Sequence, residues 1–428
     1  MAKQDLISLL AIDEAHAVEQ AGRSFRREFV DAVLAMKHLF DVMPCPVPQL
    51  AMSATFRQED YERVVSLFGL DEAIVMQGDL SRRRTHFACY VGGTQGGSLI
   101  KQATKNLTPT NQQLFYCNSR HTCENSLLES LDKLIDKHLR SKGHQAVATS
   151  FTGGDGLKMK TALMDAFTNS SQLPGEPAIH TDGTATLPKI ALLAATSAAN
   201  CGISSNELTH VHHKGFPYNM YDVVQEMGRA NRTQKLDNCS YSVYVSFSCL
   251  LTSYVRIMAS PNAQERRRLT RDLLEVVSFL LVPEMCYHSF IELYFEWETT
   301  AKQPCVNKCS YCTGACAAFT GSMKKGAIQN VLCEAILQNR NATPDSLKKA
   351  ITQAKADIFH TVPKSAAPIH ALLLQLYASK IVCFEIRDNT IVGTDKVQFK
   401  GLGCRLFHRK GRQTMGILKE TAYERDLF

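Results

Sequence analysis

Two adjacent carboxylates near the start of the chain have the clearest chemical signature in the sequence. Asp13 and Glu14 begin the tetrapeptide Asp-Glu-Ala-His, which directly follows the apolar run from Ile7 to Ile12. Parallel α/β sheets bind ligands at the carboxyl ends of their strands. In nucleotide hydrolysis, the first carboxylate of such a pair holds Mg²⁺ and the second orients the attacking water. The alternative is a solvated helix start, where acidic side chains complement the helix dipole.

Further short motifs follow at the ends of apolar runs or in a helical stretch. Two arginines three positions apart share one face of a helix, so both can reach the γ-phosphate of a nucleotide. Each motif alone is more often structural, but their order and spacing favour a motor built on two sheets. The residues are Ser53 and Thr55, then Asn118, Ser119 and Arg120, then Thr196, and finally Gln225, Arg229 and Arg232.

Five of the 15 cysteines fall between Cys286 and Cys316, and this clustering favours a metal site in a reducing compartment over a disulfide framework. Four thiolates form a closed tetrahedral site, so the zinc would be structural. Cys316 competes as a fourth ligand, and His288 could replace a cysteine. The alternative interpretation of this cluster is a group of buried free thiols that bind no metal. The four expected ligands are Cys286, Cys305, Cys309 and Cys312.

Length and composition limit the class of protein. A chain of 428 residues holds two to four domains at about 100 to 200 residues each. The apolar share of 45% and the charged share of 21% exclude a wholly disordered chain. A net charge of +7 is compatible with nucleic acid but does not prove it. The sequence has no run of about 18 apolar residues and meets acidic residues early, so we expect no membrane and no secretion signal.

The elements that position these motifs alternate between strands and helices, which predicts βαβ units and parallel sheets. Residues 29–40 have helical spacing, residues 79–100 form a basic connector that we interpret as a hinge, residues 169–186 form an insertion loop, and residues 264–300 are mostly helical. A helix at 369–380 with strands at 381–387 and 390–399 indicates a winged helix. The strands expected before these are 7–12, 50–53, 114–117, 146–151, 190–196, 210–213 and 241–247.

In this order the motifs resemble those of superfamily 2 helicases, and in detail they are similar to the RecQ group. The segments that carry the resemblance are AIDEAHAVEQAGRSFRREF, LAMSATF, FYCNSR, TSAANCGIS and QEMGRANR, within residues 7 to 315. The resemblance implies an α/β fold with two RecA-like parallel-sheet domains, the first one incomplete, then a helical zinc-binding module and a winged helix. The expected domains are 1–80, 98–255, 256–320 and 321–428.

The resemblance also implies an ATP-dependent 3′-to-5′ DNA helicase that unwinds duplex DNA in repair or recombination, in the nucleus. ATP and Mg²⁺ would be the cofactors, with a structural Zn²⁺, and single-stranded and duplex DNA the partners. The expected catalytic residues are Asp13, Glu14, Gln225, Arg229 and Arg232. The expected coupling residues are His16, Ser53 and Thr55. The expected DNA-binding residues are Arg120, Thr196, Phe25 and Arg26.

The sequence departs from the family's pattern in several places. It contains no phosphate-cradling GxxxxGK[ST] segment, so we expect a truncated or degenerate form. Ala21 stands where the family usually has Trp, Ser204 where it has Asp, and Asn231 where it has Gly. These departures favour a second hypothesis, a helicase-like DNA-binding protein without ATPase activity. An RNA helicase of the same superfamily is the third.

Overall fold

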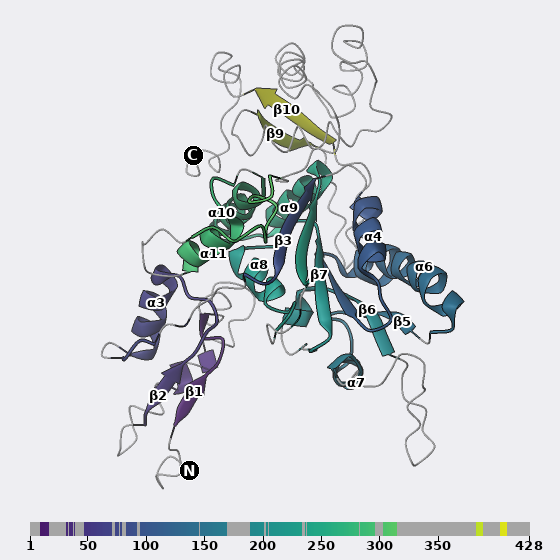
Figure 1. Cartoon of the computed structure of the whole chain (residues 1–428). Coiled ribbons are helices and arrows are strands. Elements are labelled where there is room, and N and C mark those ends of the chain that lie inside the picture. Colours follow the sequence, from purple (N-terminus) through teal and green to yellow (C-terminus); the bar gives the residue numbers. More distant parts are fainter. Residues whose placement is uncertain are drawn as a thin grey trace. The chain divides into compact units, whose positions relative to one another are not determined.

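The computed structural model divides the chain into two compact units, which are described separately. The first comprises residues 1–82 and 285–305, and the second comprises residues 83–284 and 306–428 (Figure 1). The residues that the structure describes are 9–16, 31–32, 34–36, 38, 47–70, 73–76, 78, 83–91, 95–144, 146–168, 189–200, 203, 205–232, 236, 238–281, 283–295, 303–314, 382–387 and 403–408.

The part of the first unit that the structure describes contains a short parallel sheet with helices beside it. Strands β1 (Leu10–Ile12) and β2 (Gln49–Ala51) pair in parallel, and helix α3 (Gln58–Phe68) follows β2. Helix α3 ends at Gly69, whose φ of 67° is the left-handed conformation that glycine adopts at no steric cost. Its apolar face packs on the strands, with Ala15, Val64 and Phe68 at the buried centre. Helix α11 (Tyr287–Phe295) belongs to the same unit.

The second unit is built on a six-stranded sheet whose strands are all parallel. Their order is β3-β8-β7-β4-β6-β5, so strands distant in sequence lie side by side. Strand β4 is buried at all six positions, as expected for a strand covered on both faces. The strands are β3 (His86–Val91), β4 (Gln112–Cys117), β5 (Ala146–Phe151), β6 (Lys189–Ala195), β7 (Leu208–Lys214) and β8 (Ser240–Val245).

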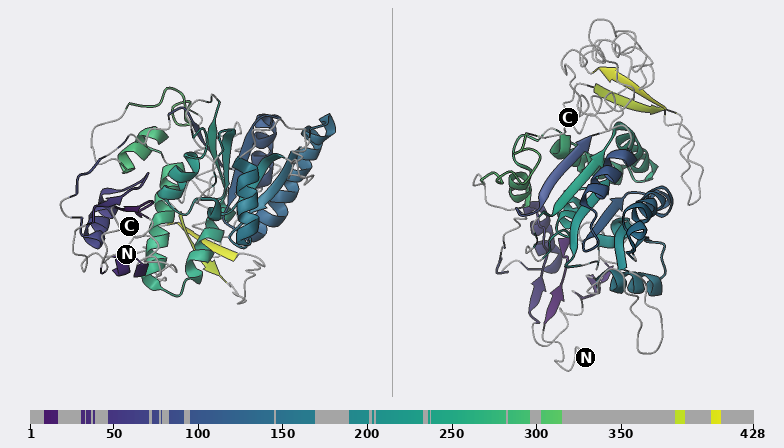
Figure 2. Two further views of the ribbon diagram at one scale, coloured as in Figure 1. Left: turned by 90° about the horizontal axis from the view of Figure 1, so that it is seen from below. Right: turned by 45° about the vertical axis from the view of Figure 1, so that its right-hand side comes forward.

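Helices cover both faces of this sheet, as the views in Figures 1 and 2 show. Helices α4 (Gln95–Asn106) and α6 (Leu128–His138) lie on one face, where Leu99 and Leu131 pack in one buried cluster with Phe115. Helices α8 (Met220–Met227), α9 (Phe247–Ala259) and α10 (Ala263–Leu281) lie on the other. Helix α7 (Leu157–Thr168) follows β5, and α5 (Arg120–Thr122) leads through a π-helical turn, Cys123–Leu127, into α6.

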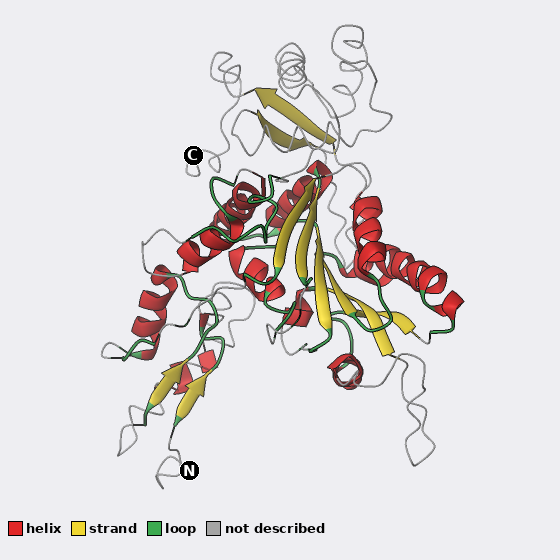
Figure 3. Ribbon diagram, in the orientation of Figure 1, coloured by secondary structure: helices red, strands yellow, loops and turns green. Residues whose placement is uncertain are grey.

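The predicted α/β fold with parallel sheets is confirmed, and the alternation of strands and helices is visible in Figure 3. The connector predicted at 79–100 is wrong in part, because residues 86–91 form the edge strand β3 and residues from Gln95 begin α4. Strand β3 is held there by Phe87, whose ring lies 5.4 Å from each of the rings of Tyr241 and Phe279. Within the described residues, no helix is long and apolar enough to cross a membrane.

Strand β9 (Val382–Arg387) agrees with the strand predicted at 381–387, and it pairs antiparallel with β10 (Gly403–His408). The strand predicted at 390–399, the helix predicted at 369–380 and the insertion loop at 169–186 lie outside the described residues. The winged helix and the four domain boundaries therefore stay predictions.

Candidate functional site

The acidic motif lies where β1 ends, at the carboxyl end of a parallel strand. Asp13 and Glu14 are exposed, and the Glu14 backbone N–H donates a hydrogen bond of 2.9 Å to Asp13 Oδ1. Glu14 has a φ of 51°, a left-handed conformation that costs a residue other than glycine about 1 to 3 kcal/mol. Such strain is typical of functional sites, and here it accompanies two exposed carboxylates, the type of group that binds a hydrated Mg²⁺.

The three predicted coupling residues are brought together next to this motif. His16 is 4% exposed, and its Nδ1 lies 2.7 Å from Ser53 Oγ and 3.2 Å from Glu14 Oε2. Ser53 Oγ donates to the Thr55 carbonyl and accepts from the Thr55 backbone N–H. Burial lowers the pKa of His16 to about 4, against the opposing effect of Asp60 and Asp13. The imidazole is therefore neutral at pH 7.

Helix α8 carries the predicted glutamine and leads directly to the two arginines. Asn219 caps the start of the helix, and its Oδ1 accepts a 2.9 Å hydrogen bond from the Asp222 N–H. Gln225 is half-buried, and Arg229, also half-buried, donates from Nη1 to the Ile203 carbonyl. Arg232 is exposed. One arginine of the pair is thus tied to the loop after β6, while the other faces solvent.

Asn231, between the two arginines, has a φ of 52°. Glycine and asparagine are the residues that tolerate this left-handed conformation best, so asparagine can stand here. Its side chain is buried, donates to the Leu236 carbonyl at 2.7 Å and accepts from the Leu236 N–H at 2.9 Å. An asparagine in place of the expected glycine is therefore compatible with the turn that contains the arginines.

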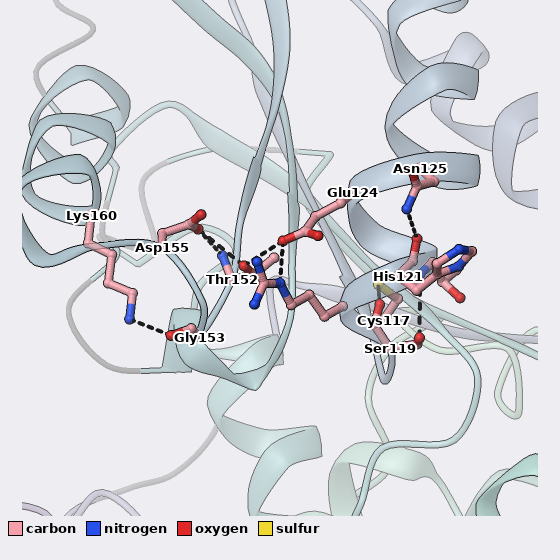
Figure 4. A network of polar contacts seen from close by, with 11 residues as sticks. Cys117, Ser119, His121, Glu124, Asn125, Thr152, Gly153, Asp155 and Lys160 are labelled. Atoms are coloured by element: carbon pink, nitrogen blue, oxygen red, sulfur yellow. Dashed lines mark hydrogen bonds and ion pairs between the residues drawn. The ribbon is translucent and has the colours of Figure 1, made fainter. Parts of the chain in front are cut away.

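Arg120 is held in a polar network at the carboxyl ends of β4 and β5, whose labelled members appear in Figure 4. Its Nε lies 2.7 Å from Glu124 Oε1, and Thr152 Oγ1 donates to the same oxygen at 3.0 Å. Thr152 N–H donates to Asp155 Oδ2 at 2.6 Å. Although burial raises the pKa of Glu124, the bonds from Arg120 and Thr152 outweigh it and hold the pKa below its usual range. Arg120 is 60% exposed and keeps its charge.

The loop after β5 was missed as part of this site. A Cβ atom on Gly154 would collide with the Arg120 guanidinium, so the glycine leaves the space that the arginine occupies. Lys160 Nζ donates to the Gly153 carbonyl at 3.1 Å (Figure 4). The sequence signal was present, because Thr-Gly-Gly-Asp-Gly directly follows an apolar strand.

Of the other three residues predicted to bind nucleic acid, the structure describes one. Thr196 follows β6, is half-buried, and its N–H donates to the Phe151 carbonyl at 3.2 Å, which sets it beside the loop after β5. Arg120 and Thr196 therefore share one edge of the sheet, although no direct contact joins them among the bonds described here. Phe25 and Arg26 lie outside the described residues.

The four predicted zinc ligands form one group. Their sulfur atoms all lie within 4.8 Å of one another, three of the residues are buried and Cys312 is half-buried. None of the four forms a disulfide. The Cys305 N–H donates to Cys286 Sγ at 3.3 Å, a bond that stabilises a thiolate. This set fits the tetrahedral all-cysteine geometry of structural zinc. His288 is not a member of the group, and Cys316 lies outside the described residues.

The loop that carries Cys309 pairs with the edge of the six-stranded sheet. Phe87 N–H of β3 donates to the Lys308 carbonyl, and Ser310 N–H donates to the Phe87 carbonyl, each at 2.9 Å. An isolated bridge thus joins Phe87 and Cys309. This contact protects the backbone groups of an edge strand that would otherwise face solvent.

No protein-family model matches the chain. It is 24% identical over 325 residues to the ATP-dependent DNA helicase Q-like 4B of Arabidopsis thaliana, covering 73% of this chain and 25% of that one. It is 22% identical over 313 residues to the ATP-dependent DNA helicase RecQ of Bacillus subtilis, covering 73% and 46%. It is 24% identical over 335 residues to a putative ATP-dependent RNA helicase of Acanthamoeba polyphaga mimivirus, covering 77% and 53%.

The chain thus spans between a quarter and about half of the length of these curated relatives. Among solved structures, the helicase Lhr of Mycobacterium smegmatis bound to single-stranded DNA and AMP-PNP matches with a TM-score of 0.42 and 14% identity, over 81% of this chain and 43% of that one. The resemblance inferred from the motifs is confirmed by the sequence comparison: the chain is similar to superfamily 2 helicases of the RecQ type.

Proposed function

We propose that this chain carries the acidic motif, the second motor domain and the zinc module of a RecQ-type, ATP-dependent DNA helicase that moves 3′ to 5′. The observation that supports this most is the hydrogen bond between His16 and Ser53. It joins the motif that handles the nucleotide to the Ser-Ala-Thr segment. A motor needs such a connection, because hydrolysis has to alter the geometry of the groups that move the strand.

In this proposal the acidic motif supports the hydrolysis of ATP. Asp13 would help to hold Mg²⁺, which would neutralise charge on the phosphates, and Glu14 would orient the water that attacks the γ-phosphate. Gln225, Arg229 and Arg232 stabilise the charge that develops on the transferred phosphoryl group. The exposed state of Arg232 suits contact with a phosphate, whereas Arg229 has to exchange its bond to the Ile203 carbonyl for one.

The carboxyl edge of the six-stranded sheet binds one DNA strand in this proposal. Arg120 supplies a charge that is 60% exposed, and the backbone of Gly153 and Gly154 lies beside it without side chains. Phosphate contacts of this kind position the strand without specifying sequence. Thr196 adds a hydroxyl at the same edge. Because Glu124 already neutralises part of the Arg120 charge, a bound phosphate has to compete with this carboxylate.

We assign Cys286, Cys305, Cys309 and Cys312 to one structural Zn²⁺. The bound ion would cross-link the four thiolates and so fold the loop that they occupy. The protein's own contribution is the Cys305 N–H bond to Cys286 Sγ and the pairing of the loop with β3. A role in DNA repair or recombination and a nuclear location belong to the same proposal.

A second candidate function is DNA binding without ATP hydrolysis. It is favoured by one observation, that no segment of the sequence has the form GxxxxGK[ST]. Magnesium-dependent affinity for ATP separates the two, because a protein that only binds DNA has no need of it.

The test of the proposed function is ATP turnover by the full chain with and without single-stranded DNA, with Glu14→Gln as the matched variant. We expect DNA-stimulated turnover that falls by about a hundredfold or more in Glu14→Gln, with ATP binding retained. Absence of both turnover and magnesium-dependent ATP binding would leave the DNA-binding function. Stronger stimulation by RNA than by DNA of the same length would contradict the assignment to DNA.

A further inference from the structure

A buried carboxylate on α8 has no part in the function proposed above. Glu226 directly follows Gln225, and its side chain is 3% exposed. Its Oε2 lies 2.7 Å from Nδ1 of His213 on β7 and accepts a 2.8 Å hydrogen bond from the hydroxyl of Tyr241 on β8. One carboxylate oxygen therefore joins the helix to two neighbouring strands of the sheet.

This arrangement is energetically demanding, so it specifies one position of the helix. A buried carboxylate is tolerated only where charge and hydrogen bonds compensate the loss of water. His213 provides both: although burial lowers its pKa, the Glu226 carboxylate outweighs this effect and raises it, which favours the imidazolium. A sliding or rotation of α8 would separate the carboxylate from two partners on different strands and leave it buried without them.

The same residue is bonded to the arginine pair through its backbone. The Glu226 carbonyl accepts a hydrogen bond of 3.1 Å from the Arg229 N–H, and the turn continues with Ala230 N–H donating to Met227 at 3.2 Å. Arg229 lies beyond the last residue of α8, Met227, and this backbone bond links its peptide directly to Glu226. The direction in which Arg229 leaves the helix thus depends on where Glu226 is held.

We propose that Glu226, held by His213 and Tyr241, is a positioning residue that sets the direction of Arg229. His213 and Tyr241 serve the same purpose from the sheet, and all three act through the position of Arg229. The inference rests on the proposed function only in its last step, that Arg229 acts on ATP. The position of Arg229 itself can be measured without any turnover.

The experiment compares two matched variants of the full chain, Tyr241→Phe and Tyr244→Phe. Each removes one buried hydroxyl from β8, but the Tyr244 hydroxyl pairs with His212 Nδ1 at 3.1 Å and not with Glu226. We expect the amides of Arg229, Ala230 and Asn231 to exchange with deuterium about tenfold faster in Tyr241→Phe, because their turn loses its anchor. In Tyr244→Phe these amides should exchange as in the unaltered protein. Glu226→Gln removes the charge that pairs with His213, but its amide oxygen can still accept the tyrosine hydroxyl, so the protein should remain folded and exchange should accelerate less than in Tyr241→Phe.

Equal exchange of these three amides in the two tyrosine variants would overturn the inference. ATP turnover is then measured in the same samples. A loss in kcat of about tenfold or more for Tyr241→Phe, with KM unchanged, is expected if Arg229 acts in the transition state, because small misplacements of such groups are costly. If Arg229 exchange responds as expected but the unaltered chain shows no turnover, the positioning stands and the proposed ATPase function fails.

Discussion

Nδ1 of His16 lies 2.7 Å from Oγ of Ser53, across 37 positions of sequence. The single proton of the Ser53 hydroxyl is directed to the Thr55 carbonyl at 2.9 Å. Both contacts are satisfied together if His16 carries its proton on Nδ1 and donates it to Ser53. The same N–H also faces Glu14 Oε2 at 3.2 Å. The neutral imidazole of His16 thus contacts both the acidic motif and the Ser-Ala-Thr segment.

This geometry predicts a dependence of stability on pH. Burial lowers the pKa of His16 to about 4, whereas in the unfolded chain it is near 6.5. Between these values the unfolded state binds a proton that the folded state does not, so the free energy of unfolding should fall as the pH drops from 6.5 to 4. The loss is about 3 kcal/mol for this residue. Urea unfolding of the protein and of His16→Asn over this range measures it as the difference between the two curves.

The exposed His121, on α5, provides the control, because His121→Asn should leave the pH dependence of the unaltered protein in place. A His16→Asn curve parallel to that of the unaltered protein would show that His16 is not the group responsible.

The sequence was sufficient to predict the main strands and the positions of most motifs, because the motifs directly follow apolar runs. Asp13, Ser53 and Arg120 were found in this way, and parallel pairing then placed each at a strand end. Strand β3 was missed because its apolar residues stand between arginines and glycines. Only its contacts with Tyr241 and Phe279, far away in sequence, show that it is buried.

The parts of the site that depend on contacts between distant side chains could not be predicted. Nothing in the local sequence of Glu226 distinguishes it from an exposed glutamate on a helix, and its burial follows from His213 and Tyr241. The contact between Gly154 and Arg120 is similar, since it joins the ends of two strands that are not neighbours in the sheet.

A second pH-dependent prediction concerns Asp222, one turn before Glu226 on α8. Burial, with a further contribution from Glu226, raises the pKa of Asp222 to about 7. The unfolded chain releases this proton near pH 4, so the folded state binds more protons between these values and the free energy of unfolding should fall as the pH rises from 4 to 7. Asp222→Asn removes the effect and should stabilise the protein at pH 8 by about 4 kcal/mol, with little change at pH 4.

Thermal and urea unfolding of Asp222→Asn at pH 4 and pH 8 provide the measurement. The exposed Asp136 is the control position, where Asp136→Asn removes a charge from the surface of α6. An equal stabilisation by Asp222→Asn at both pH values would contradict the expected role of ionisation.

Removal of metal should loosen the edge of the six-stranded sheet. Cys309 lies in the loop that pairs with β3, so a chelated protein is expected to lose the two 2.9 Å hydrogen bonds of Phe87. Deuterium exchange at the amides of Phe87 and Ser310 should accelerate, and the melting temperature should fall by several degrees. Cys309→Ser should show the same changes without chelator, together with a lower zinc content.

Cys239→Ser is the matched control for this prediction. Cys239 is also buried and forms no disulfide, but it does not belong to the group of four. Its replacement should leave the zinc content and the exchange at Phe87 unchanged. If the exchange rate at Phe87 stays unchanged after zinc has been shown to be removed, the metal does not stabilise the edge of the sheet.

The loop after β5 allows the position of Arg120 to be altered without removing its charge. A methyl group on Gly154 would occupy the space of the guanidinium, so Gly154→Ala should displace Arg120 from its place beside Thr152, while Gly153→Ala meets no atom within 4 Å. Neither glycine is among those with positive φ, so both variants should fold. We expect affinity for single-stranded DNA to fall by about threefold to tenfold in Gly154→Ala and to stay unchanged in Gly153→Ala, because one phosphate contact is misplaced in the first only.

Arg120→Ala should also reduce the salt dependence of binding. The slope of log K against log salt should fall by about 0.7, as expected for one lost phosphate contact on a single strand. Gly154→Ala retains the charge and should retain most of the slope. Fluorescence anisotropy with a labelled oligonucleotide at four salt concentrations measures both quantities. Equal affinity for the two glycine variants would mean that the strand does not pass over this loop.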